Sequence, residues 1–225
     1  MNLHPITWFM RQAVNHFVNQ GFQIYQGPQV ISEKINFDHL NVPDDHPSRD
    51  VQDTFWLENG QLLRTHTTAI DLLAMKEYRP PARIVIPGRC FRNEKTDVSH
   101  ESTFYQLDGF VIEKNIQMGH LIKTLKHFFY HLYGPDIKIR TRPHHYPFVE
   151  PGMDIDVKLK NRWREMLGSG ILHPTVLKNM NVDPKEYQGF AFGMGIDRLM
   201  MEKYQVDDIR LIHSSDLRFI KQFSR

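Results

Sequence analysis

Length, composition and charge describe an ordinary globular chain and exclude several classes of protein. Of the 225 residues, 40% are hydrophobic and 24% are charged, so the chain can bury a sizeable core and lacks the composition of a disordered protein. A formal net charge of +2 provides no large basic surface for gripping a nucleic acid backbone. The single cysteine, Cys90, excludes an internal disulfide. We expect one domain over residues 1–225, located in the cytoplasm, with no membrane segment.

Two stretches of the sequence have the pattern of an amphipathic helix. Apolar residues recur at three- and four-residue spacing over residues 6–18, with Pro5 before the pattern and Gly21 after it. A second pattern of the same kind covers residues 118–132 and stops before a Gly-Pro pair. The sequence therefore predicts a core-covering helix at each place.

Short segments rich in β-branched and aromatic residues predict strands. They cover residues 83–86, 103–112, 137–141 and 155–159, whereas residues 41–49 have the prolines and polar residues of a long loop. Turns separate most of these strands and helices separate only some. The predicted fold class is α+β, with an antiparallel sheet flanked by helices.

The first residues that ordinary folding does not explain lie around position 92. Arg92 and Glu94 precede a polar stretch, and a second segment carries Phe104, Gln106 and Asp108 at two-residue spacing. On a β-hairpin, Arg92 and Glu94 share one face, as do the three later residues. A guanidinium can bind phosphate or carboxylate oxygens bidentately, and an aromatic ring can stack on a purine. The same pattern is also compatible with a charged hairpin that carries one core phenylalanine.

A second group combines glycines with an arginine at the start of a helical pattern. Gly193 and Gly195 allow a ligand to approach the backbone closely, and Arg198 falls on the first turn of the predicted helix, where phosphates bind well. Gly27 and Pro28, which follow the first helix, are a weaker signal that an ordinary turn would also explain. Each group alone has little specificity.

In this order and at these separations, the three groups resemble motifs 1, 2 and 3 of class II aminoacyl-tRNA synthetases. The resemblance narrows to the phenylalanyl-tRNA synthetase α subunit and runs from about residue 4 to the C-terminus. The matching segments are residues 4–5, 36–38, 46–50, 53–55, 63–67, 146–151, 168–170, 189–193 and 216–219. The resemblance implies the class II catalytic fold and ATP-dependent activation of phenylalanine, as an aminoacyl adenylate, for transfer to tRNA(Phe).

By this resemblance, one set of residues forms an ATP site. Arg92 would hold the α-phosphate and the amino-acid carboxylate, Glu94 would bind the adenine amino group, and Phe104 would stack on adenine. His100 and Arg198 would hold the outer phosphates. Arg92, Arg198 and His100 are therefore the expected catalytic residues.

The resemblance also implies an amino-acid site and two cofactors, ATP and Mg²⁺. His66, Thr68, Gln106 and Asp108 would surround the α-amino group, and Tyr146, Phe148 and Ala191 would line the side-chain pocket. Glu165 is the expected Mg²⁺-linked carboxylate, because hard cations take oxygen ligands. The expected substrate is phenylalanine or a similar aromatic amino acid.

Four positions depart from the family pattern. Asp108 stands where the family has glutamate, Thr68 where it usually has serine, Tyr146 where it usually has phenylalanine, and Asp197 where it usually has glutamate. Aspartate shortens the reach to an α-amino group by about 1.5 Å, which can turn a direct hydrogen bond into a water-mediated one. We therefore hypothesise that phenylalanine is accepted weakly and that Asp108→Glu improves its activation.

The family pattern also concerns partners. The α subunit usually carries a helical tRNA-binding extension before its core and works with a β subunit, whereas this chain begins almost where the core begins. We expect poor charging of tRNA(Phe) without that arm, a β subunit as a candidate partner, and a symmetric homodimer, built through residues 22–31, when the chain is alone.

Two other functions stay open. One is a paralogue that activates an aromatic or related amino acid for an acceptor other than tRNA. The other is an inactive regulator that binds an amino acid or a nucleotide. Inactive paralogues usually lose charges from motifs 2 and 3, whereas Arg92, Glu94 and Arg198 are all present here.

Overall fold

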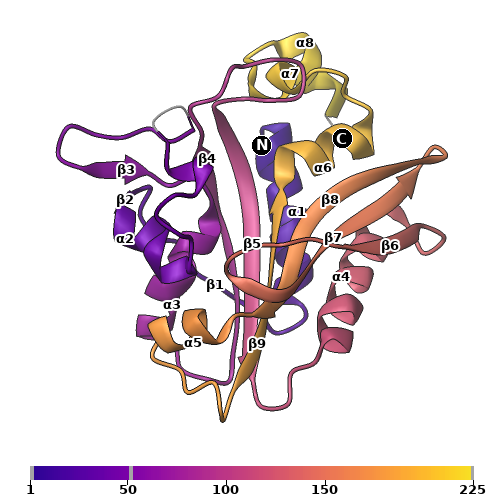
Figure 1. Ribbon diagram of the computed structural model, residues 1–225. Helices are drawn as coiled ribbons and strands as arrows, with labels where there is room; N and C mark the ends of the chain where they lie inside the picture. Colours follow the sequence, from indigo (N-terminus) through magenta and orange to yellow (C-terminus); the bar gives the residue numbers. More distant parts are fainter. Residues whose placement is uncertain (1–2, 51–52, 224–225) are drawn as a thin grey trace.

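A seven-stranded sheet forms the centre of the molecule (Figure 1). The computed structural model describes residues 3–50 and 53–223. The strand order is β1-β4-β5-β9-β8-β7-β6; β1 is parallel to β4, and the other neighbours are antiparallel. The strands are β1 (Gln23–Ile24), β4 (Ala82–Phe91), β5 (Thr103–Glu113), β6 (Lys138–Pro143), β7 (Val149–Leu159), β8 (Arg162–Leu172) and β9 (Gln188–Gly195). A separate ribbon pairs β2 (Val30–Ser32) with β3 (Gln61–Leu63).

Helices cover both faces of this sheet, which confirms the expected α+β fold. On one face lie α1 (Pro5–Val18), α4 (Met118–Tyr133) and α6 (Ile196–Tyr204). On the other lie the shorter α2 (Glu33–Asn36), α3 (Asp71–Glu77) and α5 (Pro174–Asn179), gathered at one side of the sheet in Figure 1. The predicted helices at residues 6–18 and 118–132 are α1 and α4, and both bury apolar residues at the expected spacing.

Alternation along the strands separates two apolar cores. On β5, Leu107 and Val111 belong to the core under α1 and α4, whereas Phe110 and Ile112 belong to the core under α3 and α5. Phe17 fills the centre of the first core, with its ring 5.0 Å from the rings of Phe128 and Phe192. Successive strand residues therefore serve opposite faces, and the even-numbered residues of β5 face α3 and α5.

The remaining helices are short and lie in the connections between the longer elements or after α6. They are η1 (Asp38–Leu40), η2 (Pro47–Arg49), η3 (Thr67–Ile70), α7 (Ile209–His213), α8 (Leu217–Ile220) and η4 (Lys221–Phe223). The loop between β4 and β5 reaches α7, where Ile209 N donates to Val98 O at 3.0 Å. The expected loop at 41–49 is pinned by Arg49, which pairs with Glu33 at 3.0 Å and with Asp38 at 2.8 Å. Within the described residues, every helix is too short or too polar to cross a lipid bilayer.

A buried arginine ties the turn after α1 to the centre of the sheet. Arg64 is 3% exposed and donates from Nε to Arg89 O at 2.7 Å and from Nη1 to Gly27 O at 3.1 Å. A Cβ on Gly88 would lie 1.9 Å from Arg64 Nη2, so a larger residue at this position on β4 would displace the Arg64 guanidinium. Arg64 thereby sets the position of the segment that follows it, residues 65–70, which enters the site described below.

Candidate active site

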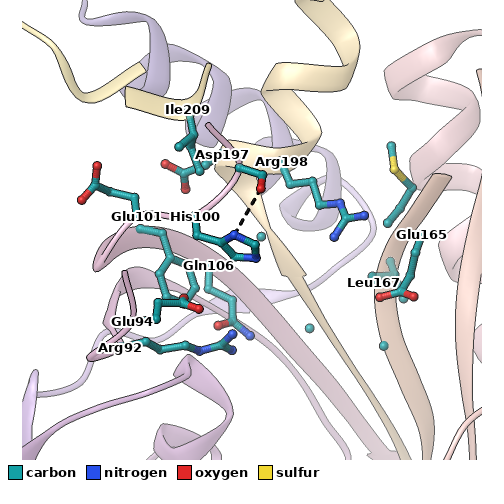
Figure 2. A pocket seen from close by; sticks show the side chains of 16 residues that line it. Arg92, Glu94, His100, Glu101, Gln106, Glu165, Leu167, Asp197, Arg198 and Ile209 are labelled. Carbon is teal, nitrogen blue, oxygen red and sulfur yellow. Dashed lines mark hydrogen bonds between the residues drawn. The ribbon is translucent and has the colours of Figure 1, made fainter. Parts of the chain in front are cut away.

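Two adjoining cavities open beside the central strands, and together they hold most of the residues singled out from the sequence. Cavity A has a volume of about 240 Å³, and its lining includes Arg92, Glu94, His100, Phe104, Glu165 and Arg198 (Figure 2). Cavity B has a volume of about 430 Å³, and its lining includes His66, Thr68, Gln106, Tyr146, Phe148 and Ala191. Four residues line both cavities: Arg92, Gln106, Gly168 and Gly193. The cavities therefore meet at a boundary that includes Arg92.

The loop after β4, and not the strand itself, carries Arg92 and Glu94. The strand ends at Phe91, so the prediction that these two residues share a face of a hairpin strand was wrong. The backbone leaves the ladder just beyond this point, after Arg92 N donates to Ser102 O at 2.9 Å. Loop geometry, which the two-residue strand period does not describe, brings both side chains to cavity A.

The predicted alternation on β5 is confirmed. Phe104, Gln106 and Asp108 follow one another on one face of the strand, on the same side as Phe110. The Arg92 guanidinium lies over the Phe104 ring, 4.9 Å from its centroid, as in a cation–π contact. One face of Phe104 is thus already covered, and a purine would stack on the other face or displace the arginine.

His100 lies in the exposed part of the same loop and is held by a carboxylate. Its Nδ1 is 3.0 Å from Asp97 Oδ2, and the backbone N–H groups of Ser99 and His100 donate to Asp97 Oδ1 at 2.6 and 2.8 Å. These hydrogen bonds, the one from Ser99 N–H first, hold the pKa of Asp97 below its ordinary value. Because Nδ1 is engaged, Nε2 is the ring atom left for a ligand in cavity A.

Arg198 lies on the first turn of α6, as predicted, and its side chain extends into cavity A (Figure 2). The adjacent Asp197 is 2% exposed and fixes this turn: its Oδ2 accepts from Tyr105 N at 2.6 Å, and its Oδ1 lies 2.5 Å from His213 Nε2. The first turn of a helix combines free N–H donors with a positive dipole end, which favours phosphate. Arg198 adds a full positive charge at the same place.

Glu165 comes from β8 and faces cavity A from the side opposite Arg92 (Figure 2). Its Oε2 accepts from Arg142 Nη2 at 2.9 Å. Among the described residues, no group of three or more His, Cys, Asp or Glu side chains could hold a metal ion. Glu165 therefore fits Mg²⁺ only if the cation takes its other oxygens from substrate phosphates and water.

Asp108 lies behind the wall of cavity B. It is 1% exposed, and its Oδ2 accepts a hydrogen bond from the hydroxyl of Thr68. Burial raises the pKa of Asp108 to about 6, against the opposing effect of that hydrogen bond. Asp108 Oδ1 and Gln106 Oε1 have no hydrogen-bond donor within the part of the chain that the structure describes. Gln106 lines cavity B and Asp108 does not, so a ligand there would meet Gln106 directly, and Asp108 would act on it as a nearby negative charge.

His66 is a neutral donor. Its Nδ1 accepts from Ala69 N at 3.2 Å, so the proton of the neutral ring is on Nε2. Burial, followed by the charges of Arg92 and Arg64, lowers the pKa of His66 to about 3, which keeps it neutral at physiological pH. An Nε2–H donor suits a substrate oxygen better than an ammonium group, so His66 fits a carboxylate better than the α-amino group expected from the resemblance.

An aromatic wall closes cavity B. The Tyr146 and Phe148 rings are 5.6 Å apart and nearly parallel, and the His144 ring stacks on Tyr146 at 4.4 Å. The Tyr146 hydroxyl donates to Asp154 Oδ1 at 2.8 Å, and burial, then this hydrogen bond, raises the pKa of Tyr146. A Cβ on Gly168 would lie 2.6 Å from the Tyr146 hydroxyl. The hydroxyl that could have served a polar substrate is therefore already paired.

Sequence reasoning missed several residues around cavity B. His46, Ser48, His144 and His145 also line it, and Asp154 holds its wall from behind. The pair His144 and His145 has no obvious pattern by itself. Asp154 lies one residue before the strand predicted at 155–159, and its alternation with Met153 and Ile155 places it on the face opposite their core without showing that this face is buried.

Fold and site together define the catalytic core of a class II tRNA synthetase. The model of the family described as tRNA synthetases class II core domain (F) matches residues 1–223. The fold is similar to that of a pyrrolysyl-tRNA synthetase from Desulfitobacterium hafniense, with a TM-score of 0.74 at 16% identity over 94% of this chain and 74% of that one.

The phenylalanine–tRNA ligase alpha subunit of Alkaliphilus metalliredigens is 44% identical, over 98% of this chain and 68% of that protein. Those of Leptospira biflexa and Acaryochloris marina are also 44% identical, over 99% of this chain and 69% and 67% of those proteins. This chain belongs to the class II tRNA synthetase family of the phenylalanine–tRNA ligase alpha subunits.

Proposed function

We propose that this chain activates phenylalanine with ATP, forming phenylalanyl adenylate and pyrophosphate, for transfer to tRNA(Phe). The observation that carries the proposal is the position of Arg92, which lines both cavity A and cavity B. Cavity A would hold ATP and cavity B the amino acid. Adenylate formation joins an atom of each ligand, and Arg92 lies where those atoms would meet.

In the reaction, an oxygen of the amino-acid carboxylate attacks the α-phosphorus and pyrophosphate leaves from the opposite side. Both reactants are anions, so their approach requires positive charge that is fixed in place. Arg92 supplies a planar fork of donors for two anions, and Arg198 supplies charge where the leaving pyrophosphate would lie. Holding the reactants in line can lower the barrier by roughly 7–11 kcal/mol, so the chain needs no covalent nucleophile.

The other residues would orient the two substrates. The α-ammonium would lie against Gln106, with the negative charge of Asp108 behind it, and the His66 Nε2–H would donate to a carboxylate oxygen. Tyr146 and Phe148 would pack against the aromatic side chain. Cavity B is apolar along this wall and polar around its base, which matches an α-amino acid with an aromatic side chain.

The family uses ATP, and we propose Mg²⁺ as the accompanying cation. Glu165 would hold it together with phosphate oxygens, and the cation would neutralise part of the charge of the triphosphate. Glu94 would bind the adenine amino group, and His100 the outer phosphates. These assignments need only side chains that already line cavity A.

The assembly is part of the proposal. The relatives are named alpha subunits, and we propose that a β subunit and tRNA(Phe) are the partners of this chain, with a homodimer when it is alone. The view of residues 1–225 as one catalytic domain stays a prediction.

A non-tRNA acceptor is not favoured, because these relatives are tRNA ligases by name. An inactive regulator is not favoured either, since Arg92, Glu94 and Arg198 all line cavity A.

Amino-acid-dependent ATP–pyrophosphate exchange, measured across the twenty standard amino acids, tests the proposal. Phenylalanine should support exchange, and Arg92→Ala should lower the rate at least tenfold, or about 1.4 kcal/mol. Arg89→Ala is a matched control, because Arg89 also lies over an aromatic ring, that of Tyr105 at 5.3 Å, but on the strand beside the cavities. Its exchange rate should stay within about threefold of the original.

Three results would contradict the proposal. Exchange with an amino acid other than phenylalanine would leave adenylate formation standing and refute the substrate. Nucleotide binding without exchange for any amino acid would favour the inactive regulator. Retention of more than a tenth of the rate by Arg92→Ala would refute the role of Arg92.

A further inference from the structure

One side chain outside both cavities touches groups that belong to each of them. Arg142 lies on β6, and its Nη2 is 2.9 Å from Glu165 Oε2, which faces cavity A. The same Nη2 is 3.1 Å from Asp154 Oδ2, and Asp154 holds the Tyr146 hydroxyl at the wall of cavity B. A continuous chain of hydrogen bonds and one ion pair, that between Arg142 and Asp154, therefore runs from Glu165 to Tyr146.

Arg142 Nη2, at the centre of this chain, has more acceptors around it than N–H groups to donate. Besides Glu165 and Asp154, Arg142 Nη2 also contacts Asp156 Oδ1 at 3.1 Å, so three carboxylate oxygens surround a nitrogen that carries two N–H donors. Arg142 Nε is engaged separately, with Asp156 Oδ2 at 2.8 Å. Full hydrogen bonds to all three oxygens are therefore impossible at once. Whatever draws Glu165 away improves the bonds that remain.

The carboxylates of Asp154 and Asp156 are buried beside Arg142, whereas the more exposed Glu165 side chain can turn away from it. The side chains of Asp154 and Asp156 are 1% and 3% exposed, and that of Glu165 is 47% exposed. A nucleotide with its magnesium in cavity A would compete with Arg142 for Glu165. Once Glu165 turns to that ligand, Nη2 can serve Asp154 fully, and Asp154 in turn holds Tyr146 and His144, whose Nδ1 lies 2.9 Å from Asp154 Oδ2.

We propose that Arg142 is a positioning residue that couples the two cavities, so that a nucleotide bound in cavity A strengthens amino-acid binding in cavity B. The inference rests on the proposed function, because it takes cavity A for the nucleotide and cavity B for the amino acid. The bistable element is the Glu165 side chain, which pairs either with Arg142 or with the ligand of cavity A. Coupling of this kind is reciprocal, so the amino acid strengthens nucleotide binding by the same factor.

Calorimetric titration of the amino acid, with and without a saturating non-hydrolysable ATP analogue and Mg²⁺, measures the coupling without turnover. The unaltered protein should bind phenylalanine at least about fivefold more tightly when the analogue is present. In Arg142→Gln this factor should fall below about twofold. Glu165→Gln should also lose the coupling, but for a different reason. Without the charge of Glu165 to compete with Asp154 for Arg142, this variant should bind phenylalanine tightly even in the absence of nucleotide.

Arg140→Gln is the matched control. Arg140 lies on the same strand, is similarly exposed and donates to Asp156 Oδ2 at 2.8 Å, and it also lies over the Trp163 ring. The partners of Arg140 are Asp156 and Trp163, whereas Arg142 also contacts Glu165 and Asp154. The Arg140→Gln variant should lose as much stability as Arg142→Gln but keep the coupling factor. This difference separates a positioning role of Arg142 from a general structural role.

Three outcomes would overturn the inference: no coupling in the unaltered protein, unchanged coupling in Arg142→Gln, or an equal loss in Arg140→Gln. The exchange assay distinguishes these from failure of the proposed function. If another amino acid supports exchange, that amino acid becomes the titrant and the coupling test stands. If no amino acid binds or supports exchange, the proposed function and the inference both fail.

Discussion

The carboxylate of Asp108 has almost no free space around it. Its Oδ2 is in contact with the Thr68 hydroxyl, and a Cβ on the facing Gly193 would lie 2.7 Å from its Oδ1. An added methylene therefore meets neighbouring atoms before it reaches the cavity. The expectation from sequence, that Asp108→Glu alone improves phenylalanine activation, takes no account of this enclosure.

The differences from the family pattern at positions 108 and 68 change the sizes of two side chains in opposite directions. Where the family has glutamate and usually serine, this chain has Asp108 and Thr68, so one carbon is lost at the first position and one is gained at the second. We expect Asp108→Glu alone to destabilise the fold by about 1–3 kcal/mol through overpacking. Thr68→Ser in the same chain keeps the hydroxyl that contacts Asp108 and is smaller by one methyl group, so it should recover most of that loss.

A double-mutant cycle measures this compensation. Chemical denaturation of the four proteins should give a favourable coupling between the two substitutions of at least about 1 kcal/mol. Exchange rates should rank the double variant above Asp108→Glu alone. Asp108→Asn keeps the size and removes the charge, so it separates packing from electrostatics. The reasoning fails if Asp108→Glu alone is as stable as the parent, or if the two substitutions are additive.

The site and its surroundings support four further predictions. Because burial raises the pKa of Asp108 to about 6, kcat/KM for phenylalanine should rise with pH through about 6, and Asp108→Asn should flatten that profile. Because this pKa lies above the ordinary value of 3.8, Asp108 keeps its proton to higher pH in the folded state than in the unfolded state. The free energy of unfolding should therefore fall as pH rises from 3.8 to about 6. Denaturation at several pH values should show this slope in the parent and not in Asp108→Asn. Gly168 lines both cavities, but an added Cβ would lie 2.6 Å from the Tyr146 hydroxyl at cavity B, so Gly168→Ala should raise KM for phenylalanine about tenfold and KM for ATP less; an equal rise in both would refute this. Ile24 and Val30 are 46% and 39% exposed near the turn after α1, so the chain alone should be a dimer by light scattering, and Ile24→Lys should yield monomers; a monomeric parent would refute this.

The fold could be predicted where local patterns are strong. Helices α1 and α4 have long apolar stripes, and β5 carries a clear alternation that placed Phe104, Gln106 and Asp108 on one face. Strands β8 and β9 were missed, because their glycines, such as Gly193, lower strand propensity and read as turns. In the structure these glycines make room for side chains of other strands.

The site could be predicted only in part, for a similar reason. Resemblance supplied residues that line the cavities, but Arg142 and Asp154 come together only through the pairing of β6 with β7. The period within one strand gives the face of each residue, whereas the register between β6 and β7 also depends on the segment that joins them. Likewise, the end of β4 at Phe91, which moves Arg92 off the strand, depends on where the backbone leaves the ladder.

The shared boundary of the two cavities has a consequence for inhibitor design. Because Arg92, Gln106, Gly168 and Gly193 line both, a molecule that spans the two cavities would pass along these four residues. A single compound with an adenosine-like part, an aromatic amino-acid part and a short neutral linker over Arg92 loses its translational and rotational freedom once, whereas two separate ligands lose it twice. Linker length, more than added contacts, should then set its affinity, since each half must keep its own place while the two are joined.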